Sequence, residues 1–247
     1  MKKYKLTEET IIVNGRTLYR IEALRDFAYI KKGNKGGFVE KENNLSQYGD
    51  SWVNDDAKVF GNAQVCGNAR IYGNAIVRGD AQVYGNASVR GNAEVFGNAE
   101  IRGDAQVYDY AEVYDNAEVL GNAEVYDNAK VFEYAEVSFD AKVYDNAKVY
   151  EYAMVQGNAK VYGNAEIRTN ACIYGDAVID SIGDYIVFKN FWSSGRSFTW
   201  TRSNDMWRVG CFYGTGEELI KKAYKDSEIS GKEYERIVKY VETIKGK

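Results

Sequence analysis

The feature that most constrains this chain is a six-residue repeat in its middle. Every sixth position from Val53 to Ile179 is valine or isoleucine, and this register holds for 22 positions without a break. Four residues after each of the first 21 of these positions lies an alanine, from Ala57 to Ala177. The corner between them most often reads Gly-Asn, as in Gly61-Asn62. Chance does not preserve two positions of a fixed period for so long, so the repeat predicts a stacked array of identical units.

One repeat, such as residues 63–68, predicts a short strand followed by a corner. Apolar and polar or variable residues alternate over the first four positions, which points alanine and valine to the same side. Glycine and asparagine then tolerate the left-handed backbone angles of a tight corner. Three strands and three corners make a triangular coil, and coils stack about 4.8 Å apart. The 22 strands therefore predict about seven coils, with a Val/Ile/Ala core that leaves no room for an internal ligand.

Length and composition restrict the functions to consider. A chain of 247 residues can bury a substantial core as one long domain with small ends. It has three cysteines without metal-type spacing and no histidine at all. No apolar run approaches the length of a membrane span, and the first residues show no signal-peptide pattern. We therefore expect a cytoplasmic protein without a membrane partner.

Charge is distributed unevenly and follows the predicted division of the chain. Residues 1–46 carry a net charge of +4 and form an N-terminal cap with a β-hairpin. Residues 47–183 carry −11 and form the hexapeptide-repeat β-helix, whereas residues 184–247 carry +3 and form a C-terminal ββ(β)αα module. An acidic rod repels nucleic-acid phosphates, so we expect no direct nucleic-acid contact along the solenoid.

The N-terminal region has the features of an end cap. Thr10–Val13 and Arg16–Ile21 flank Asn14-Gly15, which is the favoured two-residue hairpin turn. The glycine-rich stretch Lys32–Gly37 lacks nucleotide-loop spacing and a following helix, so we interpret it as a structural turn. Residues 45–52 form a degenerate first repeat that leads into the array. Such a cap is needed because the end of an array exposes open strand edges.

The C-terminal module alternates strand-like and helix-like stretches. Thr215 is a candidate N-cap for the first helix, and Cys211 lies in an apolar run that predicts burial. The tryptophans and arginines of the module form either an aromatic and basic binding face or the core and rim of a small sheet. We expect strands at 185–188, 198–201 and 207–212, and helices at 217–225 and 232–244.

Outward positions 18 residues apart lie above one another on one face of the triangle. These columns either stabilise the surface by stacking or provide an interface for a partner or a second copy. Arginine beside tyrosine in a column also allows cation–π stacking. The two aromatic columns are Tyr72, Arg90, Tyr108, Tyr126, Tyr144 and Tyr162, and Phe60, Arg78, Phe96, Tyr114, Phe132, Tyr150 and Arg168.

The corners depart from Gly-Asn between residues 108 and 152. Residues 109–151 hold 11 acidic and 3 basic residues, and the corners Glu133-Tyr134 and Glu151-Tyr152 are 18 apart. This departure is either drift among tolerant positions or an acidic, aromatic patch for a basic protein. Stacked carboxylates attract calcium, but no loop of calcium-binding type is present, so we expect no metal. The candidate partner-binding residues are Tyr108, Tyr110, Tyr114, Phe132, Glu133, Tyr134, Tyr150, Glu151, Tyr152, Trp200, Arg202 and Trp207.

The repeat resembles the hexapeptide signature of the left-handed parallel β-helix family, which includes acyltransferases and γ-class carbonic anhydrases. The resemblance implies left-handed coiling. The motif that begins at Gly36-Gly37-Phe38-Val39 and ends at Gly49-Asp50-Ser51-Trp52-Val53 is similar to uncharacterised bacterial and phage-encoded proteins, some labelled as acetyltransferases. The stretch from Val209 to Leu219 resembles a tail of other phage and mobile-element proteins. A phage origin implies the host cytoplasm as the location.

The enzymatic function that the resemblance suggests fits this chain poorly. Hexapeptide acyltransferases typically use a histidine as general base, and the carbonic anhydrases hold their metal with three, whereas this chain has none. We therefore expect no catalytic residues and no cofactor. The preferred hypothesis is a non-enzymatic scaffold that binds a macromolecular partner, such as a basic host protein, or a second copy of itself. The alternatives are an inhibitor of a host defence or nucleic-acid enzyme by acidic mimicry, and a divergent hexapeptide acyltransferase.

Overall fold

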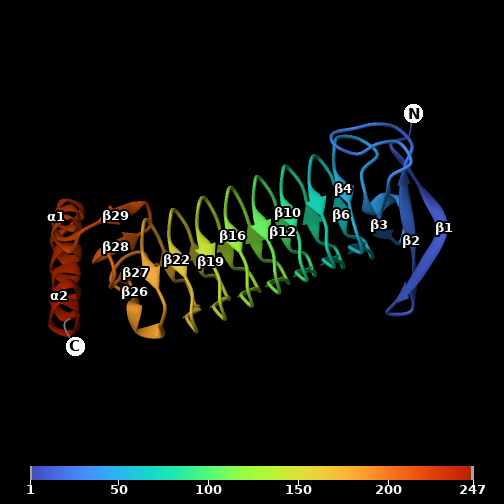
Figure 1. Cartoon of the computed structure of the whole chain (residues 1–247). Coiled ribbons are helices and arrows are strands. Elements are labelled where there is room, and N and C mark those ends of the chain that lie inside the picture. Colours follow the sequence, from blue (N-terminus) through green and yellow to red (C-terminus); the bar gives the residue numbers. More distant parts are fainter. Residues whose placement is uncertain (1, 246–247) are drawn as a thin grey trace.

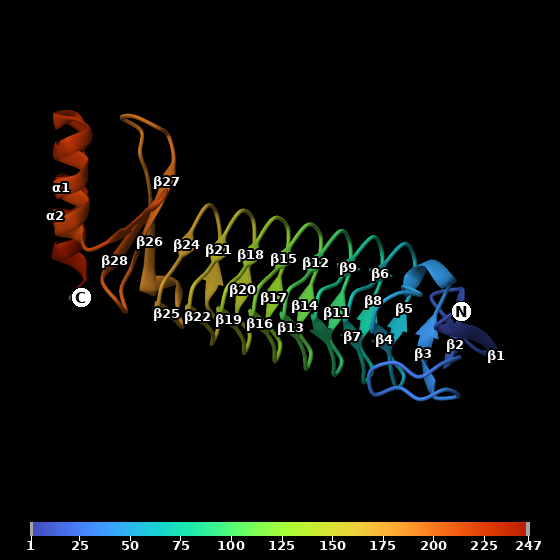
Figure 2. The same cartoon turned by 90° about the horizontal axis from the view of Figure 1, so that it is seen from above.

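A computed structural model describes residues 2–245 of the chain, which form an elongated rod (Figure 1). The N-terminal hairpin lies at one end of the rod, the solenoid forms its length, and two helices lie at the other end (Figure 2). Each of the strands β4–β25 covers one inward valine or isoleucine and the residue before it, from β4 (Trp52–Val53) to β25 (Val178–Ile179). The mainly β, parallel solenoid predicted from the repeat is confirmed.

The solenoid has three flat faces, because strands three apart in number pair in parallel. The first face contains β5, β8, β11, β14, β17, β20 and β23; the second contains β4, β7 and every third strand to β25; the third contains β6, β9 and every third strand to β24. β3 (Lys35–Val39) extends the first face, and a bridge from Leu45 to Val65 extends the third. Residues 35–53 thus form an additional coil without the consensus, which gives about eight coils instead of the predicted seven.

The core is the predicted column of valine, isoleucine and alanine. Every inward residue from Val53 to Ile179 is at most 1% exposed. Adjacent coils are joined by backbone hydrogen bonds, in which the N–H of Tyr114, for example, donates to the carbonyl of Val131 at 3.0 Å. Since each coil is bonded only to its neighbours, changes to one corner act locally.

The N-terminal hairpin consists of β1 (Tyr4–Val13) and β2 (Arg16–Ala23), joined at the predicted Asn14-Gly15 turn. β3 pairs antiparallel with β2 and parallel with β5, so the hairpin continues the first face. The interpretation of Lys32–Gly37 as a turn was wrong in its second half, because Gly36 and Gly37 lie within β3. A Cβ atom at either glycine would collide with the backbone of the adjoining coil, which explains why glycine occupies a strand here.

Two polar side chains close the N-terminal end of the solenoid. The Lys3 Nζ donates to the carbonyl of Ser51 at 2.8 Å, and the Asn44 Nδ2 donates to the carbonyl of Ala63 at 2.9 Å. Both donors are fully buried. Lys3 satisfies a carbonyl of the coil formed by residues 35–53, which has no preceding coil, and Asn44 reaches from that coil to a carbonyl of the next one. Burial lowers the pKa of Lys3 to about 8. The charge of Arg25 adds to this lowering, and the charge of Asp50 opposes it.

The C-terminal module is a four-stranded antiparallel sheet followed by two helices. The predicted strand 207–212 is in fact two strands joined by the tight turn Gly210-Cys211, where Gly210 has φ 58°. Cys211 is consequently exposed, contrary to the predicted burial. The strands are β26 (Tyr185–Lys189), β27 (Ser197–Thr201), β28 (Met206–Val209) and β29 (Phe212–Gly214).

The helices are α1 (Gly216–Asp226) and α2 (Glu228–Ile244). Thr215 caps α1 as predicted, since its hydroxyl accepts from the Glu218 N–H at 3.3 Å. α2 begins earlier than predicted because the Ser227 hydroxyl caps it by accepting from the Ser230 N–H. Within residues 2–245, no helix combines the length and apolarity that a membrane crossing requires.

Candidate functional site

The two aromatic columns form continuous ladders, as predicted. On the first face, the Arg78 guanidinium lies 4.0 Å from the Phe96 ring, and the following rings stack at 4.8–5.0 Å as far as Tyr150. On the second face, Arg90 lies 4.0 Å from Tyr108, and the tyrosines stack as far as Tyr162. The ladder rings are half-buried against one another. Four candidates therefore serve first to stabilise the surface: Tyr108, Tyr114, Phe132 and Tyr150.

The carboxylates on the faces are largely paired. The Glu124 carboxylate accepts from the Tyr108 hydroxyl at 2.8 Å and from Lys142 at 2.7 Å, and burial followed by this hydrogen bond raises the pKa of Tyr108. Lys130 pairs with Glu112 at 2.8 Å in the same way. Within residues 2–245, by contrast, none of the corner carboxylates forms an ion pair: Asp109, Asp115, Asp127, Glu133, Asp140, Asp145 and Glu151. The uncompensated negative charge therefore lies along the edges of the solenoid.

The most prominent exposed aromatic cluster lies on the edge between the first and third faces. We call Glu133, Tyr134, Glu151 and Tyr152 the corner patch. The Tyr134 and Tyr152 rings stack at 5.1 Å with 7° between their planes. They are 57% and 59% exposed, respectively, unlike the half-buried ladder tyrosines. The patch thus presents a flat, ordered aromatic surface beside two carboxylates that have no ionic partner among residues 2–245.

The backbone of the corner patch is strained. Glu133 and Glu151 have φ values of 58° and 59°, in the left-handed region that glycine occupies at Gly61, Gly79 and Gly97 of the same edge. Left-handed angles cost a non-glycine residue roughly 1–2 kcal/mol, and glutamate lacks the short side chain with which aspartate relieves this cost locally. The corners are also crowded, since a Cβ at Gly97 would lie 2.8 Å from the Asp115 nitrogen. Strained residues of this kind are often retained for function.

Other candidates do not belong to this surface. Tyr110 is 64% exposed but lies on the edge between the second and first faces. Phe139, which the sequence analysis did not single out, is 57% exposed with φ 62° on the third edge. The candidate residues of the solenoid therefore occupy more than one surface, and only the corner patch combines stacking, exposure and free carboxylates.

The structure corrects the assignment of two tryptophans to a binding face. Trp200 and Trp207 are 1% and 2% exposed and pack with Phe198 in the core of the C-terminal module. The Trp200 indole N–H donates to Asp205 at 2.8 Å, so its polar edge is satisfied internally. Of the three candidates in this module, only Arg202 is exposed. The core interpretation of these tryptophans is the right one.

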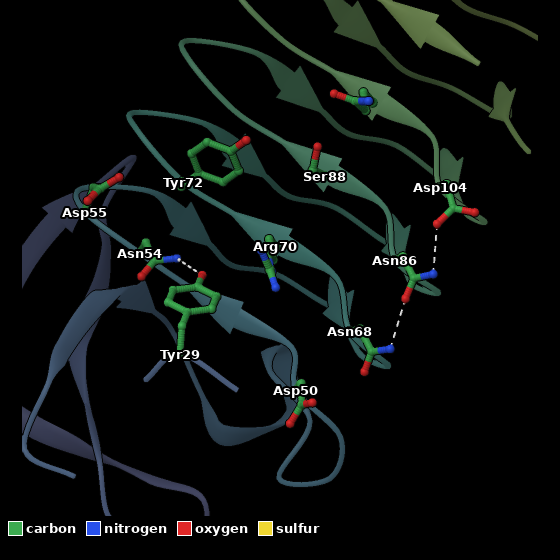
Figure 3. A pocket seen from close by; sticks show the side chains of 11 residues that line it. Tyr29, Asp50, Asn54, Asp55, Asn68, Arg70, Tyr72, Asn86, Ser88 and Asp104 are labelled. Atoms are coloured by element: carbon green, nitrogen blue, oxygen red, sulfur yellow. Dashed lines mark hydrogen bonds between the residues drawn. The ribbon is translucent and has the colours of Figure 1, made fainter. Parts of the chain in front are cut away.

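A groove near the N-terminal end was missed by sequence reasoning. It has a volume of about 700 Å³ and forms where the loop that carries Tyr29 lies over the second face (Figure 3). The position of that loop depends on how the aperiodic cap closes over the coils, which the repeat does not encode. The lining residues are Tyr29, Asp50, Asn54, Asp55, Asn68, Arg70, Tyr72, Asn86, Ser88, Asp104 and Gln106.

The groove is polar and held in place by an internal network. The Arg70 guanidinium lies 4.6 Å from the Tyr29 ring, and the Asn54 amide donates to the Tyr29 hydroxyl at 3.0 Å. On the opposite wall, Asn68 donates to Asn86 at 2.9 Å and Asn86 donates to Asp104 at 2.8 Å (Figure 3). The same amide ladders occur at other corners, so this wall is a property of the repeat rather than of a dedicated site.

The reactive side chains of the chain are dispersed. Within residues 2–245, no group of three or more cysteine, aspartate and glutamate side chains is arranged to hold a metal ion. The cysteines Cys66, Cys172 and Cys211 are all free, and burial raises the pKa of the Cys66 and Cys172 thiols.

Comparison with known proteins supports the repeat architecture. A family model described as the YdcK beta solenoid repeat matches residues 63–79, which lie in the first consensus coils. No curated protein matches the chain. The match and the parallel coils together support a family of β-helix repeats. They carry no information about an activity or a partner.

Proposed function

We propose that this protein is a scaffold that acts by binding a protein partner rather than by catalysis, and that the corner patch is its contact surface. The observation that supports this proposal is the exposed stack of Tyr134 on Tyr152, flanked by Glu133 and Glu151 in strained backbone conformations. Glycine adopts the left-handed corner conformation without a steric cost, so the two glutamates are expected to reduce stability at these corners. A costly backbone conformation that places aromatic and acidic side chains together on an exposed edge favours a binding role.

The chemistry of the corner patch favours a basic protein partner. Tyrosine is enriched at protein interfaces, because it offers a large contact area and a polar tip at a small cost in conformational entropy. Stacking at 5.1 Å holds the two rings in place before any partner arrives. The unpaired carboxylates of Glu133 and Glu151 attract lysine and arginine and disfavour acidic surfaces.

We extend the proposal to the biological setting through the resemblances stated above. The N-terminal motif is similar to uncharacterised bacterial and phage-encoded proteins, and the C-terminal tail is similar to that of phage and mobile-element proteins. Both resemblances are compatible with a phage origin and a partner in the host cytoplasm. The chain then acts as a rigid spacer that presents its edge to a host protein. Self-association through the aromatic ladders is an additional route to assembly.

Site-specific photocrosslinking tests the contact surface. A benzoyl-phenylalanine is placed at Tyr134 and, as the control, at Tyr48, which is 84% exposed near the N-terminal end. The proposal predicts a crosslinked protein, recovered from host cells, at position 134 and not at position 48. Equal crosslinking at both positions would assign the recovered protein to non-specific collision and reject the corner patch.

A second candidate is inhibition of a nucleic-acid enzyme by acidic mimicry. It is favoured by the aspartates Asp109, Asp127 and Asp145, which occupy successive coils of one edge without ion pairs within residues 2–245. This function predicts that duplex DNA competes with the protein for the crosslinked partner and that the affinity falls steeply with salt. Binding that is indifferent to both DNA and salt would exclude it.

A further inference from the structure

A second concave region lies at the C-terminal end of the solenoid and differs in charge from the rest of the rod. This C-terminal pocket has a volume of about 580 Å³. It forms where the strands and loops of the C-terminal module lie over the last coils of the third face. Its lining consists of Met154, Gln156, Asn170, Cys172, Lys189, Gly195, Arg196, Ser197, Arg208 and Gly210.

The pocket is lined by cations without carboxylates. Lys189, Arg196 and Arg208 all line it, and no aspartate or glutamate does. Within residues 2–245, none of these three side chains forms an ion pair, whereas five of the ten basic residues of the solenoid do. A concave wall with one sign of charge concentrates the local potential and attracts counterions. The C-terminal module therefore provides a positive cavity against an acidic rod.

Arg208 is held in a fixed orientation. Its guanidinium lies 4.3 Å from the Tyr174 ring, and its Nη1 donates to the Cys211 carbonyl at 3.5 Å. The Cys172 thiol lies beside Arg208 on the floor of the pocket. Burial raises the pKa of this thiol, and the charge of Arg208 partly opposes that rise. A guanidinium that is oriented in advance loses less entropy when it binds an anion.

Two acidic groups, Glu136 and Asp226, lie close to residues of the pocket but form no ion pair with its cations within residues 2–245. Glu136 accepts from the Gln156 amide at 2.9 Å and from the Ser138 hydroxyl at 2.6 Å. Asp226 lies in a smaller adjoining hollow that also contacts Arg196, but no ion pair joins the two residues. The cationic side chains therefore have no internal anion that an external one must displace.

We propose that the C-terminal pocket binds a small phosphate-bearing anion. Guanidinium groups recognise phosphate oxygens through paired N–H donors, and a lysine adds a compact third charge. Met154 and Cys172 form an apolar floor that suits a compact ligand with an apolar portion. A nucleic-acid strand fits less well, because the adjoining solenoid carries −11 and repels its remaining phosphates.

Calorimetric titration of the full chain with inorganic pyrophosphate tests this proposal. The wild type is expected to bind, and Arg196→Gln/Arg208→Gln is expected to raise the Kd at least tenfold. Arg202→Gln is the matched control, because Arg202 is an exposed arginine of the same module that does not line the pocket. Absence of binding to the wild type, or an equal loss in the control, would overturn the proposal.

Two further measurements separate ligand chemistry from misfolding. Arg196→Gln alone alters an exposed side chain, so it is expected to weaken pyrophosphate binding while the unfolding temperature without ligand stays unchanged. Pyrophosphate is expected to raise the unfolding temperature of the wild type and not that of the double variant. Tighter binding of citrate than of pyrophosphate would overturn the assignment to phosphate.

Discussion

Lys3 shows how a single residue closes the open end of a repeat. An unpaired ammonium group in a protein interior is costly, but here it has carbonyl and hydroxyl acceptors on Ser51 at 2.8 and 3.2 Å. These acceptors belong to the first coil, whose outer edge has no preceding coil. The cost of removing the ammonium group from water is offset because it donates hydrogen bonds to buried acceptors. The ammonium group also lies 5.4 Å from the centre of the Phe27 ring.

The first prediction concerns this lysine and pH. Because burial lowers the folded-state pKa of Lys3 to about 8, the unfolded state binds more protons than the folded state above that pH. The free energy of unfolding of the wild type is therefore expected to rise as the pH increases from about 8 towards 9.5. Lys3→Met should lack this rise and lose about 1–3 kcal/mol at neutral pH, because its acceptors are left unsatisfied. Urea unfolding at both pH values measures this, and an equal rise in both proteins would contradict it.

The second prediction concerns the strained glutamates. Glu133→Gly removes a side chain from a left-handed position and should raise the free energy of unfolding by about 1 kcal/mol. Asp115→Gly is the matched control one coil earlier on the same edge, where φ is 58° but the short carboxylate tolerates the conformation better. Denaturant unfolding is expected to show the larger gain for Glu133→Gly. A loss of stability in that variant would mean that the corner is not strained.

At the scale of the structural element, the corner glycines are constrained by both angle and space. Gly15 in the hairpin has φ 75° and no atom within 4 Å of a Cβ built on it, whereas Gly97 has φ 71° and the next coil 2.8 Å away. Gly15→Ala is therefore expected to lower the free energy of unfolding by about 1–2 kcal/mol, which is the cost of a left-handed backbone conformation for a residue with a Cβ atom. Gly97→Ala should cost more, because adjacent coils must separate. Thermal unfolding measures both variants. An equal loss of stability in Gly15→Ala and Gly97→Ala would show that the spacing between coils does not restrict the side chain at a corner.

The tyrosine ladder of the second face makes a prediction about alkaline pH. Burial, together with the neighbouring Tyr144 and Glu124, raises the pKa of Tyr126 to about 12. Since this folded pKa lies above the unfolded value of about 10, the ladder favours folding below pH 10 and loses that contribution as the pH rises towards 12. Tyr126→Phe keeps the stacking and removes one ionisable group, so tyrosinate absorbance should show one fewer late-titrating phenol. Unchanged late titration would contradict the assignment.

Sequence periodicity determined the inward residues, the stacking columns and the order of the elements, because those features depend only on spacing along one repeat. It could not place Lys3, whose burial depends on the cap folding back over the first coil. The burial of Trp200 and Trp207 likewise depends on α1 and α2 covering the small sheet. The N-terminal groove and the C-terminal pocket both form where aperiodic segments overhang a face, which a one-dimensional pattern does not describe.

At the scale of the whole molecule, the rod separates three surfaces along its length. The N-terminal groove is lined by the cap and the first coils, the corner patch follows β17 and β20 on one edge, and the C-terminal pocket is lined by the last coils and the C-terminal module. Because each coil contacts only its neighbours, a substitution at one surface leaves the others intact. The acidic solenoid lies between two basic ends, and this alternation of charge along the rod directs how charged partners approach it.

The most direct test of the central claim replaces the corner patch with the sequence of the repeat itself. Glu133→Gly/Tyr134→Asn with Glu151→Gly/Tyr152→Asn restores two Gly-Asn corners such as Gly61-Asn62. Affinity for the crosslinked partner and the free energy of unfolding are measured on the same preparations. Affinity is expected to fall at least tenfold while the free energy of unfolding is retained or increased. Unchanged affinity in a folded variant would contradict it.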